Sequence, residues 1–160
     1  MLLVRPRFHH TPPDGWMNDP VGLYVHRGRW YLHYQRATDR EHREMGWGCA
    51  SSADLLHWMG EPDALRADEN GWIYSGSVVT GAGPGDAAFA AFYTRHDPGT
   101  GRQRQELALS RDGLEWHAHA SNPLIDEKRS ETRDPFVFPF GGEWRMVVAE
   151  PVAWSDPLTG

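Results

Sequence analysis

The chain has 160 residues, a length that favours one domain, and its 17 glycines, 12 prolines and 12% aromatic residues favour short strands and tight turns over helices. A formal net charge of -6, with no run of Lys or Arg, argues against nucleic acid and anionic membrane surfaces as partners. The single cysteine, Cys49, excludes an intramolecular disulfide. Residues 1–5 are too short for a signal-peptide core and no segment is long and apolar enough to span a bilayer, so we expect a cytoplasmic protein.

In chain order, three short runs have the composition of β-strands and are each followed by turn residues: Trp30–Tyr34, Ala90–Thr94 and Trp144–Val148. A turn pattern recurs around them. Ser52–Trp58 and Ser110–Trp116 both read Ser-x-Asp-x-x-x-Trp, 58 positions apart. An internal period of this length, with several strands in each copy, predicts the blades of a β-propeller.

A second turn pattern keeps almost the same period. Asp97–Gly101 and Asp156–Gly160 both read Asp-Pro-x-Thr-Gly, 59 positions apart. We therefore expect an all-β chain with blade one at about 19–58, blade two at about 75–116 and blade three from about 134, cut off at Gly160. Because so few blades cannot close a ring, the pattern predicts the N-terminal part of a longer propeller. The alternative is a β-sandwich whose turn signals match by chance.

Two Asp-Pro steps, Asp19-Pro20 and Asp134-Pro135, lie two of these periods apart. A lone Asp-Pro usually only starts a turn. At equivalent positions of innermost strands, however, the two carboxylates would converge on one axial pocket, and facing carboxylates are the working parts of a glycosidase. Asn18 and Arg133 directly precede them, and Arg133 could keep a neighbouring carboxylate ionised.

The motifs resemble those of glycoside hydrolase family 32, which contains invertases, inulinases, levanases and β-fructofuranosidases. The segment around Asp19 is similar to the Trp-Met-Asn-Asp-Pro-Asn-Gly signature of that family, with Val21 in place of the second Asn. Further blocks follow in the family's order, covering nearly the whole chain: the Tyr-Gln element ending at Gln35, a Trp-Gly-His-Ala block at 47–50 with Cys49 in place of His, Phe-Ser-Gly-Ser at 74–77, and Arg-Asp-Pro at 133–135.

The resemblance implies a five-bladed β-propeller that hydrolyses β-fructosyl bonds of sucrose, inulin or levan type with retention. By the same resemblance, Asp19 is expected to be the nucleophile and Asp134 the stabiliser of the transition state. The substrate-binding residues expected from the matching motifs are Asn18, Gln35, Tyr74, Ser75 and Arg133.

The family's general acid/base Glu is expected beyond Gly160. Glu150 is a poor candidate for this role, because Pro151 and Val152 follow it where the family has a Glu-Cys motif. Without the general acid, the isolated chain would be inactive or very weak.

Two further functions share these residues: a non-catalytic sugar-binding remnant of the same fold, and a fructosyltransferase. We expect a small-molecule or oligosaccharide fructoside as partner, and neither a cofactor nor a catalytic metal. His117 and His119 come nearest to ligand spacing but have no evident third ligand, and Cys49 is expected to be a buried apolar thiol. The sequence does not distinguish among the fructosides or predict the oligomeric state.

Overall fold

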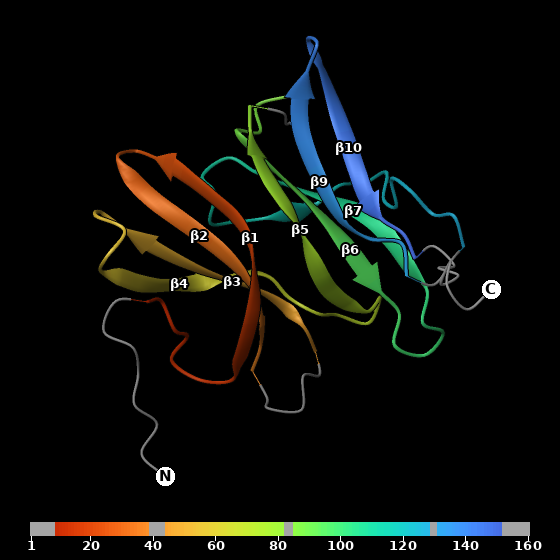
Figure 1. Cartoon of the computed structure of the whole chain (residues 1–160), viewed down its shortest axis with the longest axis horizontal. Helices are drawn as coiled ribbons and strands as arrows, with labels where there is room; N and C mark the ends of the chain where they lie inside the picture. The colour runs from red at the N-terminus through yellow and green to blue at the C-terminus, as the bar shows by residue number, and fades with distance from the viewer. Residues whose placement is uncertain (1–8, 39–43, 82–84, 129–130, 152–160) are drawn as a thin grey trace, which may run out of the picture.

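A computed structural model describes residues 9–38, 44–81, 85–128 and 131–151. Its ten strands form three antiparallel sheets, and the described residues contain no helix (Figure 1). The all-β class predicted from glycine, proline and aromatic content is therefore confirmed. In this part of the chain, nothing has the length and apolar character of a membrane-crossing helix.

Each sheet is an up-and-down meander in which consecutive strands pair. The first sheet contains β1 (Trp16–His26), β2 (Arg29–Ala37), β3 (Gly46–Ser52) and β4 (Trp58–Leu65). The second contains β5 (Trp72–Thr80), β6 (Phe89–His96), β7 (Gln103–Ser110) and β8 (His117–Ala118). The third contains β9 (Arg133–Phe140) and β10 (Glu143–Ala149). The three runs predicted as strands lie within β2, β6 and β10.

The sheets meet through their first strands, because β1 packs on β5 and β5 packs on β9 (Figure 1). Apolar side chains from the first two sheets form the core between them: Val21, Trp47, Ile73, Ala91, Tyr93 and Ala108. The indole of Trp47 also donates a 2.9 Å hydrogen bond to the backbone oxygen of Tyr74, so one side chain links β3 to β5. Each first strand is thus held from both sides, and its backbone is fixed relative to its neighbours.

The recurring Ser-x-Asp-x-x-x-Trp segments form the same turn. In both copies the Ser hydroxyl and the Asp carboxylate accept the following backbone N–H groups, and the Trp indole closes the turn; six hydrogen bonds match one to one. Leu55 has φ 65° where the second copy has Gly113 with φ 78°. The Asp97–Gly101 turn is also present, with Asp97 accepting from two backbone amides. Its predicted copy at Asp156–Gly160 lies outside the described residues.

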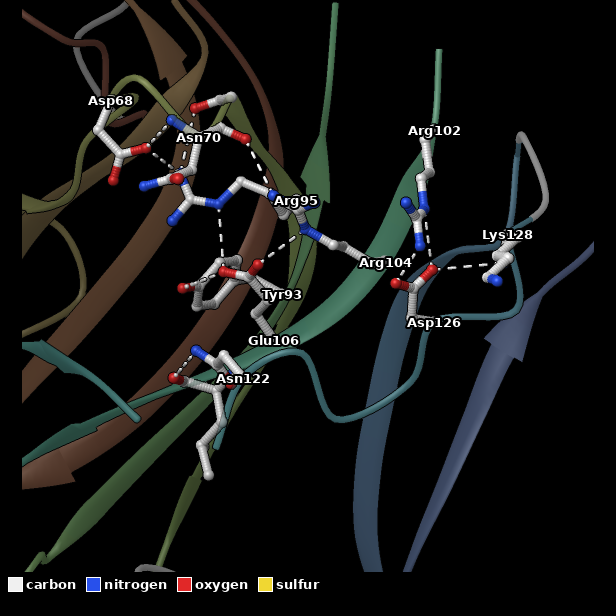
Figure 2. A network of polar contacts seen from close by, with 12 residues as sticks. Asp68, Asn70, Tyr93, Arg95, Arg102, Arg104, Glu106, Asn122, Asp126 and Lys128 are labelled. Atoms are coloured by element: carbon white, nitrogen blue, oxygen red, sulfur yellow. Dashed lines mark hydrogen bonds and ion pairs between the residues drawn. The ribbon is translucent and has the colours of Figure 1, made fainter. Parts of the chain in front are cut away.

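The connection from the first sheet to the second is anchored by an ionic network (Figure 2). Arg95 donates to the Gly71 carbonyl and to Asp68, and Arg104 donates to the Asn70 carbonyl. Both guanidinium groups also bind the carboxylate of Glu106, which accepts a further hydrogen bond from a Tyr93 hydroxyl 3.0 Å away. The network fixes the backbone that leads directly into β5.

All three first strands are irregular where their motif residues lie. The register of β1 shifts around Pro20, that of β5 shifts between Ile73 and Gly76, and that of β9 shifts between Arg133 and Phe136. A bulge leaves residues unpaired and turns their side chains away from the regular alternation. At Gly76 the approach is so close that a Cβ atom would lie 2.0 Å from a backbone oxygen of β6. The irregularities are the local reason why three strands can direct side chains to one point.

Candidate active site

A cavity of about 280 Å³ lies where β1, β2, β5 and β9 meet. All seven residues singled out in the sequence line it, together with one that was not: Asn18, Asp19, Gln35, Met45, Tyr74, Ser75, Arg133 and Asp134. Its volume is near the lower end of the range of about 300–1,000 Å³ for small-molecule sites. The cavity therefore suits one sugar ring, with the rest of a larger substrate left outside.

The carboxylate of Asp19 is held by the neighbouring sheet. The hydroxyl of Ser75 donates a 2.6 Å hydrogen bond to Asp19 Oδ2 and lies 3.3 Å from Gln35 Oε1. Ser75 and Gln35 are buried, with 7% and 5% of their surfaces exposed. Because a hydroxyl has a single hydrogen, it can donate to only one of the two oxygens, and the shorter contact shows that it donates to Asp19. Charge-assisted hydrogen bonds of this length are among the stronger ones in proteins.

Asp134 occupies a strained backbone position at the start of β9. Its φ is 57°, a left-handed conformation that is uncommon for residues other than glycine. Burial raises the pKa of its carboxyl group, and the charge of Asp19 raises it further, while Arg133 lowers it. The Arg133 Nε atom lies 3.9 Å from Asp134 Oδ2. Arg133 thus favours the ionised form, as its position in the sequence suggested, but burial outweighs it.

The ring of Tyr74 is stacked on a partner that the sequence did not reveal. The rings of Tyr74 and His96 are 4.6 Å apart between centroids and inclined by only 10°. Burial lowers the pKa of His96; the charge of Asp97 opposes this shift and that of Arg133 adds to it, so the net effect favours the neutral imidazole. One face of Tyr74 is therefore covered by protein, which leaves its other face and its edge for the cavity.

Met45 is the lining residue that sequence reasoning missed. It is 6% exposed, and its backbone oxygen accepts a 2.8 Å hydrogen bond from the amide of Ile73. A methionine just before a strand carries no chemical signature, so only the packing of β3 against β5 could place it. Met45 gives the otherwise polar cavity one apolar wall.

Other candidates lie away from this cavity. Glu150 follows β10 and is not among the lining residues. Cys49 is 1% exposed, and burial raises the pKa of its thiol to about 12, which confirms the inert buried thiol that was expected. In the ranges that the structure describes, no three His, Cys, Asp or Glu side chains gather as metal ligands would.

The chain is similar to known proteins over nearly its whole length. The model of the glycosyl hydrolases family 32 N-terminal domain matches residues 9–156. The levanase of Bacillus subtilis is 39% identical over 157 residues, which cover 91% of this chain and 23% of the levanase. A sucrose-6-phosphate hydrolase of Escherichia coli is 39% identical over 154 residues, which cover 89% of this chain and 31% of that protein.

The structure of β-fructofuranosidase from Schwanniomyces occidentalis complexed with fructosyl-erythritol superposes with a TM-score of 0.80 at 33% identity. The match covers 90% of this chain and 31% of that one, so the chain spans less than a third of that protein's length. Likeness to fructofuranosidases of this kind confirms the predicted fold class, a part of a five-bladed β-propeller.

Proposed function

The chain belongs to glycosyl hydrolase family 32, and from this premise we propose that the protein hydrolyses β-fructosyl bonds by double displacement, with retention of configuration. Asp19 is the nucleophile and Asp134 stabilises the transition state. The observation that carries the proposal is the convergence of these two carboxylates, from β1 and β9, on one small cavity. A retaining glycosidase uses one carboxylate of its sugar-binding site as the nucleophile, and Asp19 has such a position.

In the first step, a carboxylate oxygen of Asp19 attacks the anomeric carbon of the fructosyl unit, and the bond from this carbon to the leaving oxygen breaks. The leaving oxygen takes a proton from a general acid. The Ser75 hydroxyl occupies Asp19 Oδ2, so we assign the attack to Oδ1. In the second step, water gives its proton to the same acid/base group and its oxygen displaces Asp19, which releases fructose.

Asp134 acts on the charge that develops at the sugar ring. An ionised carboxylate beside the cavity accepts hydrogen bonds from fructose hydroxyls and favours the oxocarbenium-like transition state over the neutral substrate. Its partial burial has an energetic cost, because the raised pKa reflects a charge that is partly kept from water. Arg133 offsets part of this cost, and Asn18 and Gln35 supply amide groups for the remaining hydroxyls.

Two parts of the reaction come from outside the described cavity. The carboxyl groups that line the cavity are Asp19 and Asp134, and both already have other roles. We therefore assign the general acid/base to a residue outside the cavity lining. The leaving group also extends beyond a cavity of this size. Related proteins are named levanase and sucrose-6-phosphate hydrolase, so we propose a β-fructoside without specifying the group that is released.

The test is a matched pair of variants in the protein as its gene encodes it. Asp19→Asn keeps the shape of the nucleophile and removes its charge, and kcat is expected to fall by at least about 10³-fold. Asp86→Asn is the control, because Asp86 is an exposed carboxylate on the β5–β6 connection, paired with Arg111 and distant from the cavity. Fructose release at the wild-type rate from Asp19→Asn would refute the nucleophile assignment. Sugar binding without turnover in the wild type would indicate a non-catalytic module instead, and acceptor-linked products would indicate a transferase.

A further inference from the structure

The backbone of Asp134 needs support that the cavity itself does not provide. A residue other than glycine stays at φ 57° only where its surroundings hold it there. The side chains that line the cavity with Asp134 make no hydrogen bond to its backbone within the described part of the chain. The support comes from the second sheet, through side chains that do not line the cavity.

Three hydrogen bonds in series hold the segment before and at Asp134. The amide of Asp134 donates to Thr94 Oγ1 at 3.0 Å, and the Thr94 hydroxyl donates to Gln105 Oε1 at 2.8 Å. The Gln105 Nε2 group then donates to the carbonyl oxygen of Thr132 at 2.6 Å. Every donor meets an acceptor in one consistent direction, so the series fixes the Thr94 hydroxyl, the Gln105 amide and the backbone at both ends.

A second contact fixes the segment after Asp134. The Ser77 hydroxyl donates to the carbonyl oxygen of Pro135 at 2.9 Å and accepts the amide of Val137 at 3.0 Å. Ser77, Thr94 and Gln105 come from β5, β6 and β7, one from each main strand of the sheet. Residues 132–137 are therefore held at several points by one neighbouring blade, with Asp134 in the middle.

These polar side chains are buried where packing alone would favour apolar ones. Thr94 is 0% exposed and Gln105 is 1% exposed, and the two are directly paired in the β6–β7 register. A buried hydroxyl or amide costs free energy unless it is fully hydrogen-bonded, and an apolar pair at this position would avoid that cost. Besides their mutual hydrogen bond, the two side chains bind the backbone of Thr132 and Asp134. These contacts explain why polar side chains occupy the two buried positions.

We propose that Thr94 and Gln105 are positioning residues that hold the backbone of Asp134 in the left-handed conformation and so aim its carboxylate into the cavity. This inference rests on the proposed function, in which that carboxylate faces the sugar. Because neither residue lines the cavity, both act through Asp134. A misplacement of about 1 Å in a catalytic group can cost about 10²-fold in rate, so loss of this support affects turnover more than binding.

The experiment compares three variants of β6 in the protein as its gene encodes it. Thr94→Val keeps the shape and removes the hydroxyl, and Thr94→Ser restores it. Tyr93→Phe is the matched control, because it removes a buried hydroxyl from the adjacent residue. Within the described part of the chain, this hydroxyl donates to Glu106 and not to the segment around Asp134 (Figure 2). The readouts are amide hydrogen exchange at Asp134 and the separate values of kcat and KM for fructose release.

We expect Thr94→Val to speed exchange at Asp134 by at least about tenfold and to lower kcat by about 10–100-fold with a smaller change in KM. Thr94→Ser should recover most of both. Thr94→Val that matches Tyr93→Phe in both readouts would overturn the proposal. If Thr94→Val does not fold, amide hydrogen exchange in the wild-type protein tests the proposal. An Asp134 amide that exchanges as fast as exposed loop amides would also overturn the proposal. A folded wild type that releases no fructose would refute the proposed function, while the exchange readout still decides whether Thr94 holds Asp134.

Discussion

The hydroxyl of Ser75 on β5 donates a 2.6 Å hydrogen bond to the carboxylate of Asp19 on β1. The two residues are 56 positions apart, close to one repeat of the chain, so the second blade supports the reactive group of the first. The same blade also supports the third sheet, where the hydroxyl of Thr94 on β6 accepts a hydrogen bond from the backbone amide of Asp134. The second sheet therefore supports the carboxylate-bearing residues of both of its neighbours.

Removal of the Ser75 hydroxyl should weaken catalysis more than folding. Hydrogen bonds to charged groups are worth about 1.5–3 kcal/mol, and a factor of ten in rate corresponds to about 1.4 kcal/mol, so Ser75→Ala is expected to lower kcat/KM by about 10–100-fold. The effect should appear mainly in kcat, because the hydrogen bond orients the attacking group. Steady-state kinetics with a β-fructoside measures it.

Ser52→Ala provides the comparison for Ser75→Ala, since it removes a buried hydroxyl that serves a turn remote from the cavity. It should lower the free energy of unfolding and leave kcat/KM near the wild-type value. Equal kcat/KM in Ser75→Ala and the wild type would show that the hydrogen bond to Asp19 does not matter for the reaction.

The acid side of the pH profile should depend on Arg133. Burial raises the pKa of Asp134 and Arg133 lowers it. If the ionised form is required, kcat/KM falls as pH decreases through this raised pKa. Arg133→Gln removes the cation, which raises the pKa further and moves the acid limb to higher pH, whereas Arg133→Lys keeps the charge and should move it less. An acid limb that stays in place or moves to lower pH in Arg133→Gln would contradict the role assigned to Asp134.

Asp134 should be a residue at which function and stability oppose each other. Its folded-state pKa is raised above the unfolded value, so the folded protein binds more protons between the two values and stability falls as pH rises through that window. Asp134→Asn removes the charge, and Asn also adopts positive φ more readily. The variant should therefore unfold at a higher temperature at pH 7 while losing activity.

The gain from Asp134→Asn is expected to stay below about 1 kcal/mol, since the side chain is 46% exposed and water screens its charge. It should shrink at about pH 3, where Asp is largely protonated in both states. Thermal unfolding at the two pH values measures the difference. A lower unfolding temperature for Asp134→Asn at pH 7 would rule out this explanation.

The repeated turn predicts a stabilising substitution. Leu55 adopts φ 65° where the other copy has glycine, and 40% of its surface is exposed, so its removal loses only part of the apolar contact of a core leucine. The left-handed conformation costs a non-glycine residue about 1–2 kcal/mol, which glycine avoids. Glycine also has more conformational freedom in the unfolded chain, which reduces the gain in stability by about 0.4–1 kcal/mol. Leu55→Gly should therefore raise the free energy of unfolding by about 0.5 kcal/mol, as measured by denaturant titration.

The reverse change in the second copy should destabilise. In Gly113→Ala a Cβ atom would lie 2.4 Å from the hydroxyl of Tyr24, which is hydrogen-bonded to the Gly113 carbonyl and to His33. Overpacking of this kind typically costs about 1–3 kcal/mol, in addition to the strain of positive φ. If Gly113→Ala is neutral and Leu55→Gly destabilises, the two turns are not equivalent in solution.

The elements and residues that the sequence revealed are those with a recurring local pattern. The strand runs at 30–34, 90–94 and 144–148 combine β-branched or aromatic residues with a following turn, and each lies in a strand of the structure. Asp19 and Asp134 could be selected because their motifs keep the period of the fold. Local sequence pattern and tertiary packing favour the same structure at these positions, so these strands and carboxylates can be predicted from the sequence.

The residues that the sequence did not reveal depend on contacts between blades. Thr94 begins the polar run Thr94-Arg95-His96 at the end of β6, which has the composition of a solvated strand end. Gln105 likewise lies in a polar stretch of β7. The approach of residues 132–137 gives the pair its hydrogen-bond partners, and the packing of Tyr74 on the imidazole identifies His96. Such contacts join segments too distant in sequence for periodicity to predict.

The covalent intermediate is the most direct test of the central claim that Asp19 is the nucleophile of a retaining β-fructosidase. The measurement is mass spectrometry of the proteolytic peptide that contains Asp19, after rapid acid quenching of the protein during turnover of a β-fructoside. The account predicts a fraction of this peptide heavier by one fructosyl unit, and none in Asp19→Asn. An unmodified peptide during rapid turnover, with fructose first released in the inverted configuration, would contradict it.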